Sequence, residues 1–258
     1  MDSSISDSFR GCGFVVVGAA GGMGSVLCRE LVAGGASVLL CGRTDSGLAE
    51  LGRELSMPHL VLDASDFAQT ATAFETAKQQ FGRLDGAANL AGSIMLRAAH
   101  QCSQQDVAEV LRLNLMTAFS VVRAAAMTMR QPASDRGASV VLMSSTAART
   151  GLANHEAISA AKAGVIGLTQ SAAATYASAI RFNCIAPGLT RTPMAQPLLA
   201  SEMAEKASVA MHPVGRVGEV ADVVPALLWL LSPASGFVTG QTIGIDGGLS
   251  TVRPRVKV

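Results

Sequence analysis

Lys162 is the only charged residue of the stretch "SAAKAGVIG", whose alanines and glycines predict a buried, closely packed helix surface. An ammonium group is rarely buried without a partner, so its place here indicates contact with an anionic or polyhydroxyl ligand rather than with solvent. One helical turn earlier, on the same predicted face, the chain has Ile158. Isoleucine neither gives nor accepts a proton, so proton transfer beside this helix needs a donor at another position.

A glycine-rich turn follows the first apolar run. The sequence "VGAAGGMGSVLCREL" places Gly18, Gly22 and Gly24 at a G-x-x-x-G-x-G spacing, with Met23 between the last two, before a predicted helix. Glycines there permit a tight turn and let a pyrophosphate approach the N–H groups of a helix N-terminus. Alone, "GAAGG" might be only a turn, but its place between a strand and a helix favours a dinucleotide site.

The end of the second apolar run indicates which dinucleotide binds. Many dinucleotide sites place an acid there to hold the ribose hydroxyls, whereas "VLLCGRTD" has Gly42 and then Arg43. An arginine favours a 2′-phosphate, so we expect NADP(H) to be preferred, with NAD(H) possible. Two observations leave the alternative open: Arg43 could be a solvated charge ahead of a helix, and Asp45 lies nearby.

The elements that must position these residues alternate along the chain. Seven apolar runs, "FVVVGA", "SVLLCG", "HLVLD", "LDGAANLAG", "SVVLMSS", "IRFNCIAPG" and "TIGID", read as buried parallel strands, with segments of helical length between them. The fold class is α/β: a single-domain, Rossmann-type, doubly wound parallel sheet over 1–258, with helices on both faces. We expect the irregular segment at about 188–217 to be a lid over the substrate.

Composition narrows the classes of partner. With 20 basic and 19 acidic residues, and no basic block beyond the tail "RPRVKV", nothing indicates nucleic-acid binding. Two charge-free runs, 163–180 and 223–245, approach membrane-spanning length, but polar residues and Gly or Pro interrupt both, so buried helices explain them better. "MDSSISDSFRG" is unlike a signal peptide. We expect a cytoplasmic protein with no membrane or metal site.

The five cysteines, Cys12, Cys28, Cys41, Cys102 and Cys184, are odd in number and lack metal-ligand spacing. We therefore expect reduced, mostly buried thiols.

Taken together, these motifs resemble the short-chain dehydrogenase/reductase family, and the resemblance covers nearly the whole chain. "LDAS" carries Asp63 where family members bind adenine, "NLAG" resembles the family's NNAG, and "IRFNCIAPGLTRTPM" resembles the stretch that cups the nicotinamide. The cofactor-binding positions that this resemblance implies are Gly18, Gly22, Met23, Gly24, Arg43, Asp63, Asn89, Ala91, Gly92, Lys162, Pro187, Gly188 and Thr192.

The resemblance also implies catalytic roles. Asn114 matches the family's structural and proton-relay asparagine, Ser145 its substrate-orienting serine, and Lys162 the lysine that holds the nicotinamide ribose. Either polar side chain might instead bond to nearby backbone. The family's tyrosine, four residues before the lysine, is Ile158 here, and the chain's one tyrosine, Tyr176, is interpreted as a packing residue. Loss of a positioned general acid typically costs about 10²- to 10⁴-fold in rate.

His155 is a candidate replacement donor. If the helix already includes His155, then His155, Ile158 and Lys162 fall on one stripe, whereas Glu156 points elsewhere. Enoyl-acyl-carrier-protein reductases, a divergent branch of the family, carry their tyrosine seven residues before the lysine, which is the spacing of His155. A histidine with a pKa near about 6.5 could donate a proton at neutral pH. Equally, His155 could be a solvated or hydrogen-bonded residue at a helix entrance.

Three functions remain open. The first, which we favour, is an NADP(H)-dependent oxidoreductase acting on a carbonyl, alcohol or activated double bond of a small apolar substrate. The second is a non-redox enzyme, such as a dehydratase, isomerase or cyclase, and the third a silent nucleotide-binding relative. Met194, Met203 and Met211 could line an apolar substrate pocket or merely fill gaps. The apolar helices predict a homo-oligomer, a tetramer or dimer.

Overall fold

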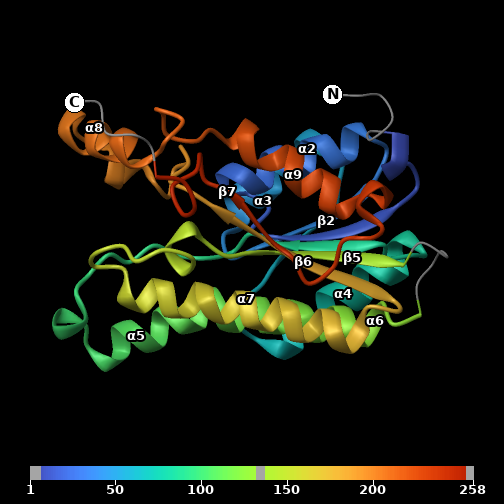
Figure 1. Cartoon of the computed structure of the whole chain (residues 1–258). Coiled ribbons are helices and arrows are strands. Elements are labelled where there is room, and N and C mark those ends of the chain that lie inside the picture. Colours follow the sequence, from blue (N-terminus) through green and yellow to red (C-terminus); the bar gives the residue numbers. More distant parts are fainter. Residues whose placement is uncertain (1–6, 132–136, 254–258) are drawn as a thin grey trace.

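A computed structural model describes residues 7–131 and 137–253 of the chain. Within these ranges, parallel strands form one seven-stranded sheet in the order β3-β2-β1-β4-β5-β6-β7 (Figure 1). The strands are β1 (Gly13–Val17), β2 (Ser37–Gly42), β3 (His59–Val61), β4 (Gly86–Asn89), β5 (Ala138–Met143), β6 (Ile180–Pro187) and β7 (Thr242–Ile245). Each predicted strand is confirmed, and so is the doubly wound parallel fold.

The strand order reverses at β1, which lies between β2 and β4. In an open α/β sheet this switch point leaves a crevice beyond the carboxyl ends of the strands, where ligands bind. The predicted glycine turn leaves β1 at that crevice, and the "NLAG" stretch leaves β4 beside it.

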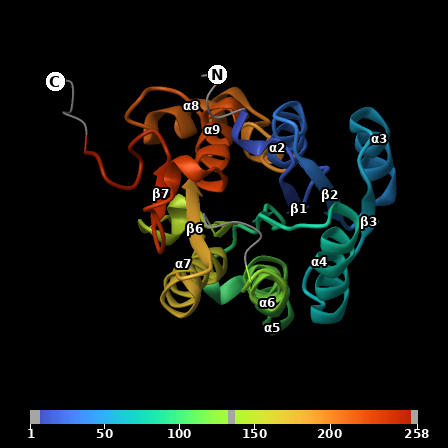
Figure 2. The same ribbon diagram turned by 90° about the vertical axis from the view of Figure 1, so that its right-hand side faces the viewer.

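Helices cover both faces of the sheet (Figure 2). One layer contains α2, α3 and α9, and the other contains α4, α6 and α7. The α-helices of the described ranges are α2 (Gly22–Ala33), α3 (Asp45–Leu55), α4 (Phe67–Phe81), α5 (Gln104–Leu111), α6 (Thr117–Thr128), α7 (Glu156–Tyr176), α8 (Glu202–Met211) and α9 (Val220–Leu231). A π-helical turn, η3 (Arg112–Met116), joins α5 to α6. Short 3-10 turns are η1 (Asp7–Phe9), η2 (Ala99–Gln101), η4 (Thr146–Ala148), η5 (Gln196–Leu199) and η6 (Pro233–Ser235).

Each face of the sheet has its own hydrophobic core. Alternate residues of a strand point to opposite faces, so Val15 and Val17 of β1 enter the core with α4, α6 and α7, and Phe14 and Val16 the core with α2, α3 and α9. This double burial explains why the strands read as continuous apolar runs instead of alternating ones.

The segment predicted as a lid contains more regular structure than its sequence indicates. After β6, the chain forms η5 and then α8, and Thr190 pairs with Gly218 in an isolated parallel bridge that closes the base of the segment. Met194, Met203 and Met211 are 49%, 80% and 49% exposed, so in this conformation they do not line an enclosed apolar pocket.

The two charge-free runs noted in the sequence lie within the fold: the first belongs mainly to α7, and the second covers most of α9 and extends to β7. A different stretch, Gln104–Thr128, is long and apolar enough to cross a membrane, but 56% of its apolar window is buried inside the protein, as in the core helix of a globular domain. The N-terminal lead-in before Asp7 and the basic tail after Arg253 lie outside the described residues.

Candidate active site

The turn between β1 and α2 depends on its glycines. Gly18 has φ +82°, a left-handed conformation, and a Cβ built on it would lie 2.8 Å from Ala91 N. A Cβ on Gly24 would lie only 2.1 Å from the Gly18 carbonyl oxygen. The backbone of the turn is therefore packed directly against itself and against the loop after β4, which brings two of the predicted cofactor segments together.

The N-terminus of α2 fits an anionic ligand. Its cap residue, Gly21, provides no side-chain hydrogen bond, and the first turn of this 12-residue helix contains no acid. The N–H groups of that turn and the positive end of the helix dipole are thus available to a phosphate. A Cβ on Gly22 would lie 3.0 Å from Pro193 and 3.2 Å from Thr192, so the segment predicted to cup the nicotinamide lies directly over the predicted pyrophosphate turn.

Arg43 and Asp63 follow the neighbouring strands β2 and β3. Arg43 is exposed, and the nearby acid Asp45 begins α3 and pairs with His59 Nε2 at 3.3 Å. Asp63 accepts hydrogen bonds from the Ser65 hydroxyl and N–H, which hold the pKa of its carboxyl below the usual range, with Arg112 contributing further.

Arg112 binds two acidic side chains near the end of β3. It donates to Asp63 Oδ2 at 2.7 Å and forms a two-bond pair with Glu109 at 2.7 and 2.8 Å. Hydrogen bonding to Arg112 lowers the pKa of Glu109, and the charge of Arg43 adds to the effect. The sequence analysis did not single out Arg112 or Glu109, because only the fold brings this helix beside the end of β3.

The loop after β4 is fixed by Asn89. This buried side chain donates to Thr117 Oγ1 at 3.3 Å and accepts from Ala91 N at 3.2 Å. Gly92, in the same loop, borders two other predicted site residues. A Cβ built on it would lie 2.8 Å from Asn114 Oδ1 and 3.4 Å from Lys162 Nζ. The fold therefore gathers Gly92, Asn114 and Lys162 at one point of the crevice, and Asn89 holds the loop that carries Gly92 there.

Lys162 is buried on α7, and its ammonium group donates to the Met143 carbonyl oxygen at the end of β5 at 2.9 Å. The Ser144 hydroxyl in turn donates to the Lys162 carbonyl oxygen at 2.9 Å, which ties α7 to the strand end. Burial lowers the pKa of Lys162 to about 8, because desolvation disfavours the charged ammonium.

Asn114 lies in the π-helical turn between α5 and α6, a feature that the sequence did not predict. Such turns occur frequently at functional sites. Its amide nitrogen donates to Ser93 Oγ and to the Val110 carbonyl, each at 3.0 Å, and its Oδ1 accepts from Ser93 N at 3.2 Å. The Ser93 hydroxyl was not predicted from the sequence as part of the site. Its one signal is its place directly after "NLAG".

Ile158 lies in an apolar environment on α7. It is 5% exposed and belongs to a small apolar cluster with Val110, Ala157 and Ala161, against which Met95 packs. Ser145 is partly buried after β5, and its Oγ accepts from Ala147 N at 3.2 Å, a capping contact that leaves the hydroxyl proton free to point elsewhere.

His155 stands just before α7, not within it. The helix begins at Glu156, and His155 is its N-cap, with its Nδ1 2.7 Å from the Ala153 carbonyl oxygen. The condition for one stripe with Ile158 and Lys162, that the helix include His155, is thus not met. A carbonyl oxygen can only accept, so Nδ1 is the donor of this bond, and Nε2 is left for another partner.

Pro187 and Gly188 lie at the carboxyl end of β6, as their predicted role requires. Pro187 is in register with Ile245 of β7, and Gly188 N donates to the Ile245 carbonyl at 3.0 Å. A Cβ on Gly188 would lie 2.8 Å from His212 Nε2, so the end of α8 packs against this residue.

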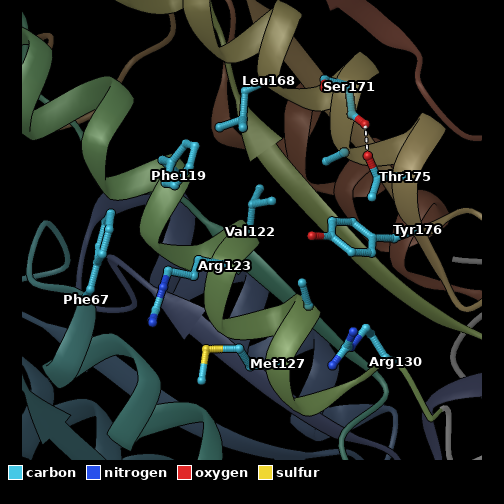
Figure 3. Close-up of a pocket in the computed structure, with 12 residues that line it drawn as sticks. Phe67, Phe119, Val122, Arg123, Met127, Arg130, Leu168, Ser171, Thr175 and Tyr176 are labelled. Carbon is cyan, nitrogen blue, oxygen red and sulfur yellow. Dashed lines mark hydrogen bonds between the residues drawn. The ribbon is translucent and has the colours of Figure 1, made fainter.

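An apolar groove lies away from this crevice. Figure 3 shows it on the outer face of α6 and α7, beside the start of α4. Its volume is about 620 Å³. Tyr176, the last residue of α7, lines the groove and contacts Phe182, with ring centroids 6.0 Å apart. The tyrosine is a packing residue, as expected, and lies nowhere near the position of Ile158.

Comparisons with known proteins agree with this geometry. Residues 18–250 match the family model described as enoyl-(acyl carrier protein) reductase. An uncharacterised short-chain type dehydrogenase/reductase of Sinorhizobium fredii is 33% identical over 92% of this chain, which spans 43% of that longer protein. The 3-oxoacyl-[acyl-carrier-protein] reductase of Thermotoga maritima is 32% identical over 91% of this chain and 96% of its own.

A solved structure is similar over nearly the full length of both chains. The gluconate 5-dehydrogenase of Burkholderia cenocepacia, in complex with NADP and tartrate, superposes with a TM-score of 0.88 at 27% identity, covering 96% of this chain and 99% of its own. These similar proteins are thus named as a reductase and as dehydrogenases, and one of them was solved with NADP bound. With its glycine turn, its Asn114–Lys162 corner and these similarities, the chain belongs to the short-chain dehydrogenase/reductase family.

Proposed function

We propose that the chain is an NADP(H)-dependent cytoplasmic oxidoreductase that acts on a carbonyl, an alcohol or an activated double bond of a small apolar substrate. The observation that supports this most is the meeting of Gly92, Asn114 and Lys162 at the loop that packs against the glycine turn before α2. A catalytically silent relative would not need a buried lysine in the crevice. A nucleotide that served only as structure would not require the residues beside the nicotinamide to be retained.

The residues have separate roles in this proposal. Gly18, Gly22, Met23 and Gly24 hold the pyrophosphate, and Lys162 donates to the nicotinamide ribose. Asp63 and the loop after β4 hold the adenosine half and Arg43 the 2′-phosphate, while Pro187, Gly188 and Thr192 border the nicotinamide. When bound, the dinucleotide supplies or takes the hydride, and Ser145 orients the substrate oxygen. Since Ile158 cannot move a proton, His155 and Lys162 are the candidate donors.

The experiment that tests the function measures binding of NADPH and NADH to the purified protein by fluorescence titration. Carbonyl and enoyl compounds are then screened for nucleotide oxidation. Turnover of a substrate supports the proposal. Binding of nucleotide without turnover of any substrate would favour the non-redox or silent alternatives, and failure to bind either nucleotide would refute all three.

We expect Arg43→Ala to weaken NADPH binding by at least about tenfold, because hydrogen bonds to charged groups contribute roughly 1.5–3 kcal/mol. NADH has no 2′-phosphate, so its dissociation constant should stay the same. Arg53→Ala, at an exposed position in the last turn of α3, is the matched control. An unchanged preference for NADPH in Arg43→Ala would contradict the assignment.

We also propose that the groove of Figure 3 seats a second copy of the chain. Phe67 and Phe119 stack there with ring centroids 5.8 Å apart, and Phe119 and Met127 are 46% and 55% exposed. Exposed apolar side chains gathered on one face are typical of a subunit interface, and the same face of two copies can pair about a two-fold axis.

Light scattering at micromolar concentration should therefore find a dimer or tetramer. Phe119→Asp should shift the protein to smaller species, because it would bury a carboxylate in the paired face. Met203→Asp, at a position 80% exposed on α8 and outside the groove, should leave the assembly unchanged. A monomeric unmodified chain, or no response to Phe119→Asp, would refute this interface.

A further inference from the structure

The Lys162 ammonium group lies between the carboxyl ends of two neighbouring strands. It donates to the Met143 carbonyl oxygen of β5 at 2.9 Å and borders Gly92, which follows β4. An ammonium group has three N–H donors, and Met143 is the one acceptor recorded for it among the described residues. Two N–H bonds of Lys162 therefore remain for groups that enter the crevice.

The other candidates for proton transfer are less well placed. Position 158 has an alkyl side chain packed into an apolar cluster, and His155 stands before the first helical residue of α7 with its ring bonded to the Ala153 carbonyl oxygen. Tyr176 is the last residue of the same helix and lines the groove on the outer face of α6 and α7, away from the crevice. Of the described residues, Cys184 on β6 is the one titratable group near enough to influence the pKa of Lys162, and burial raises the pKa of its thiol, which disfavours the charged thiolate.

We propose that Lys162 is itself the proton donor, passing a proton from its ammonium group directly to the substrate oxygen in place of a phenol. This inference rests on the proposed oxidoreductase function. In reduction, an N–H bond of Lys162 breaks and an O–H bond forms on the substrate, while the carbonyl carbon receives the hydride that a reduced nicotinamide supplies. The neutral amine then regains a proton from water. In alcohol oxidation, the neutral amine accepts the hydroxyl proton.

The pKa of Lys162, lowered by burial to about 8, suits this role, because a donor works best when its pKa is near the working pH. The two directions should then respond oppositely to pH. Reduction needs the ammonium form, so kcat for reduction should fall as the pH rises through about 8. Oxidation needs the neutral amine, so kcat for oxidation should rise over the same range.

Lys162→Arg separates proton transfer from ribose binding. The guanidinium keeps the positive charge and the N–H donors but holds its proton at any working pH. We expect kcat to fall by at least about 100-fold, the size of a lost general acid, while the dissociation constant of NADPH changes by less than about threefold. A circular dichroism spectrum checks that the variant is folded.

Lys162→Ala provides a second test through rescue. Primary alkylamines of graded pKa should restore turnover, with rates that depend on the pKa of the amine, since the added amine then donates the proton. Retained turnover in Lys162→Arg, or rescue that follows the size of the amine and not its pKa, would overturn the assignment and leave Lys162 as a ribose-binding residue.

A direct titration needs no bound nucleotide. The chain has four lysines, Lys78, Lys162, Lys206 and Lys257, so the signals of a ¹³C-lysine NMR spectrum can be assigned with one variant each. The Lys162 signal should titrate near the pH at which kcat changes, and titration above about pH 10, the ordinary value for lysine, would overturn the proposal.

His155→Ala tests the histidine as the alternative proton donor. A fall in turnover of at least about tenfold in this variant, with full activity in Lys162→Arg, would assign the donor to the histidine instead. If the unmodified chain binds no NADPH or turns over no substrate, the proposed function itself fails. If it is active and only the Lys162 results disagree, the donor assignment alone fails.

Discussion

Ile158→Tyr should raise the rate of NADPH-dependent ketone reduction by about tenfold, because a phenol at this position adds a second general acid beside the Lys162 amine, and one positioned general acid contributes about 10²- to 10⁴-fold. Position 158 lies one turn before Lys162 on α7, and both side chains are buried. A phenol there would stand near the Lys162 ammonium group, whose positive charge favours loss of the phenolic proton. The measurement is steady-state kcat with the same ketone for both proteins.

The matched control is Ile158→Phe, which adds the same ring without the hydroxyl. Either ring enlarges a side chain packed against Val110 and Ala161, and such overpacking costs about 1–3 kcal/mol, so thermal unfolding of both variants must be compared. A gain in Ile158→Tyr alone identifies the hydroxyl as its cause. Equal rates in the two folded variants would show that the crevice does not place a substrate oxygen beside position 158.

Gly24→Ala should abolish measurable nucleotide binding, with the NADPH dissociation constant rising by at least about 100-fold. The added methyl group would lie 2.1 Å from the Gly18 carbonyl oxygen and 2.9 Å from that of Ala19, both backbone atoms of the same turn, so the turn itself must move. The pyrophosphate contacts depend on that turn, because they are made by backbone N–H groups whose positions the turn sets. Fluorescence titration with NADPH measures the loss.

Gly167→Ala is its control, since both glycines lie within helices and a Cβ on Gly167 would meet nothing within 4 Å. Alanine is about 1 kcal/mol more favourable than glycine in a helix interior, so this variant should bind NADPH normally and be slightly more stable. A folded Gly24→Ala protein that binds NADPH with unchanged affinity would show that the nucleotide does not rest on the turn after β1.

The sequence by itself determined the fold and the candidate residues. Continuous apolar runs predict parallel strands buried on both faces, and the structure has these strands because each enters two separate cores. The glycine spacing predicted a close turn that only residues without a Cβ can form, as Gly18 and Gly24 now show. Such properties are local, since they depend on the residues of one strand, one turn or one helix face.

Only the tertiary structure decided how these pieces meet. Ser93 and Asn114 are 21 residues apart in the sequence, and Asp63 and Arg112 are 49 residues apart. Each pair comes together through the crossover connections of the sheet, so the sequence could not predict either contact. Periodicity also did not reveal the π-helical turn at Asn114, or that α7 begins one residue after His155, because helix ends and bulges depend on backbone hydrogen bonds instead of side-chain pattern. The low pKa of Lys162 has the same origin, since burial beneath β4 and β5 removes the water that would stabilise its charge.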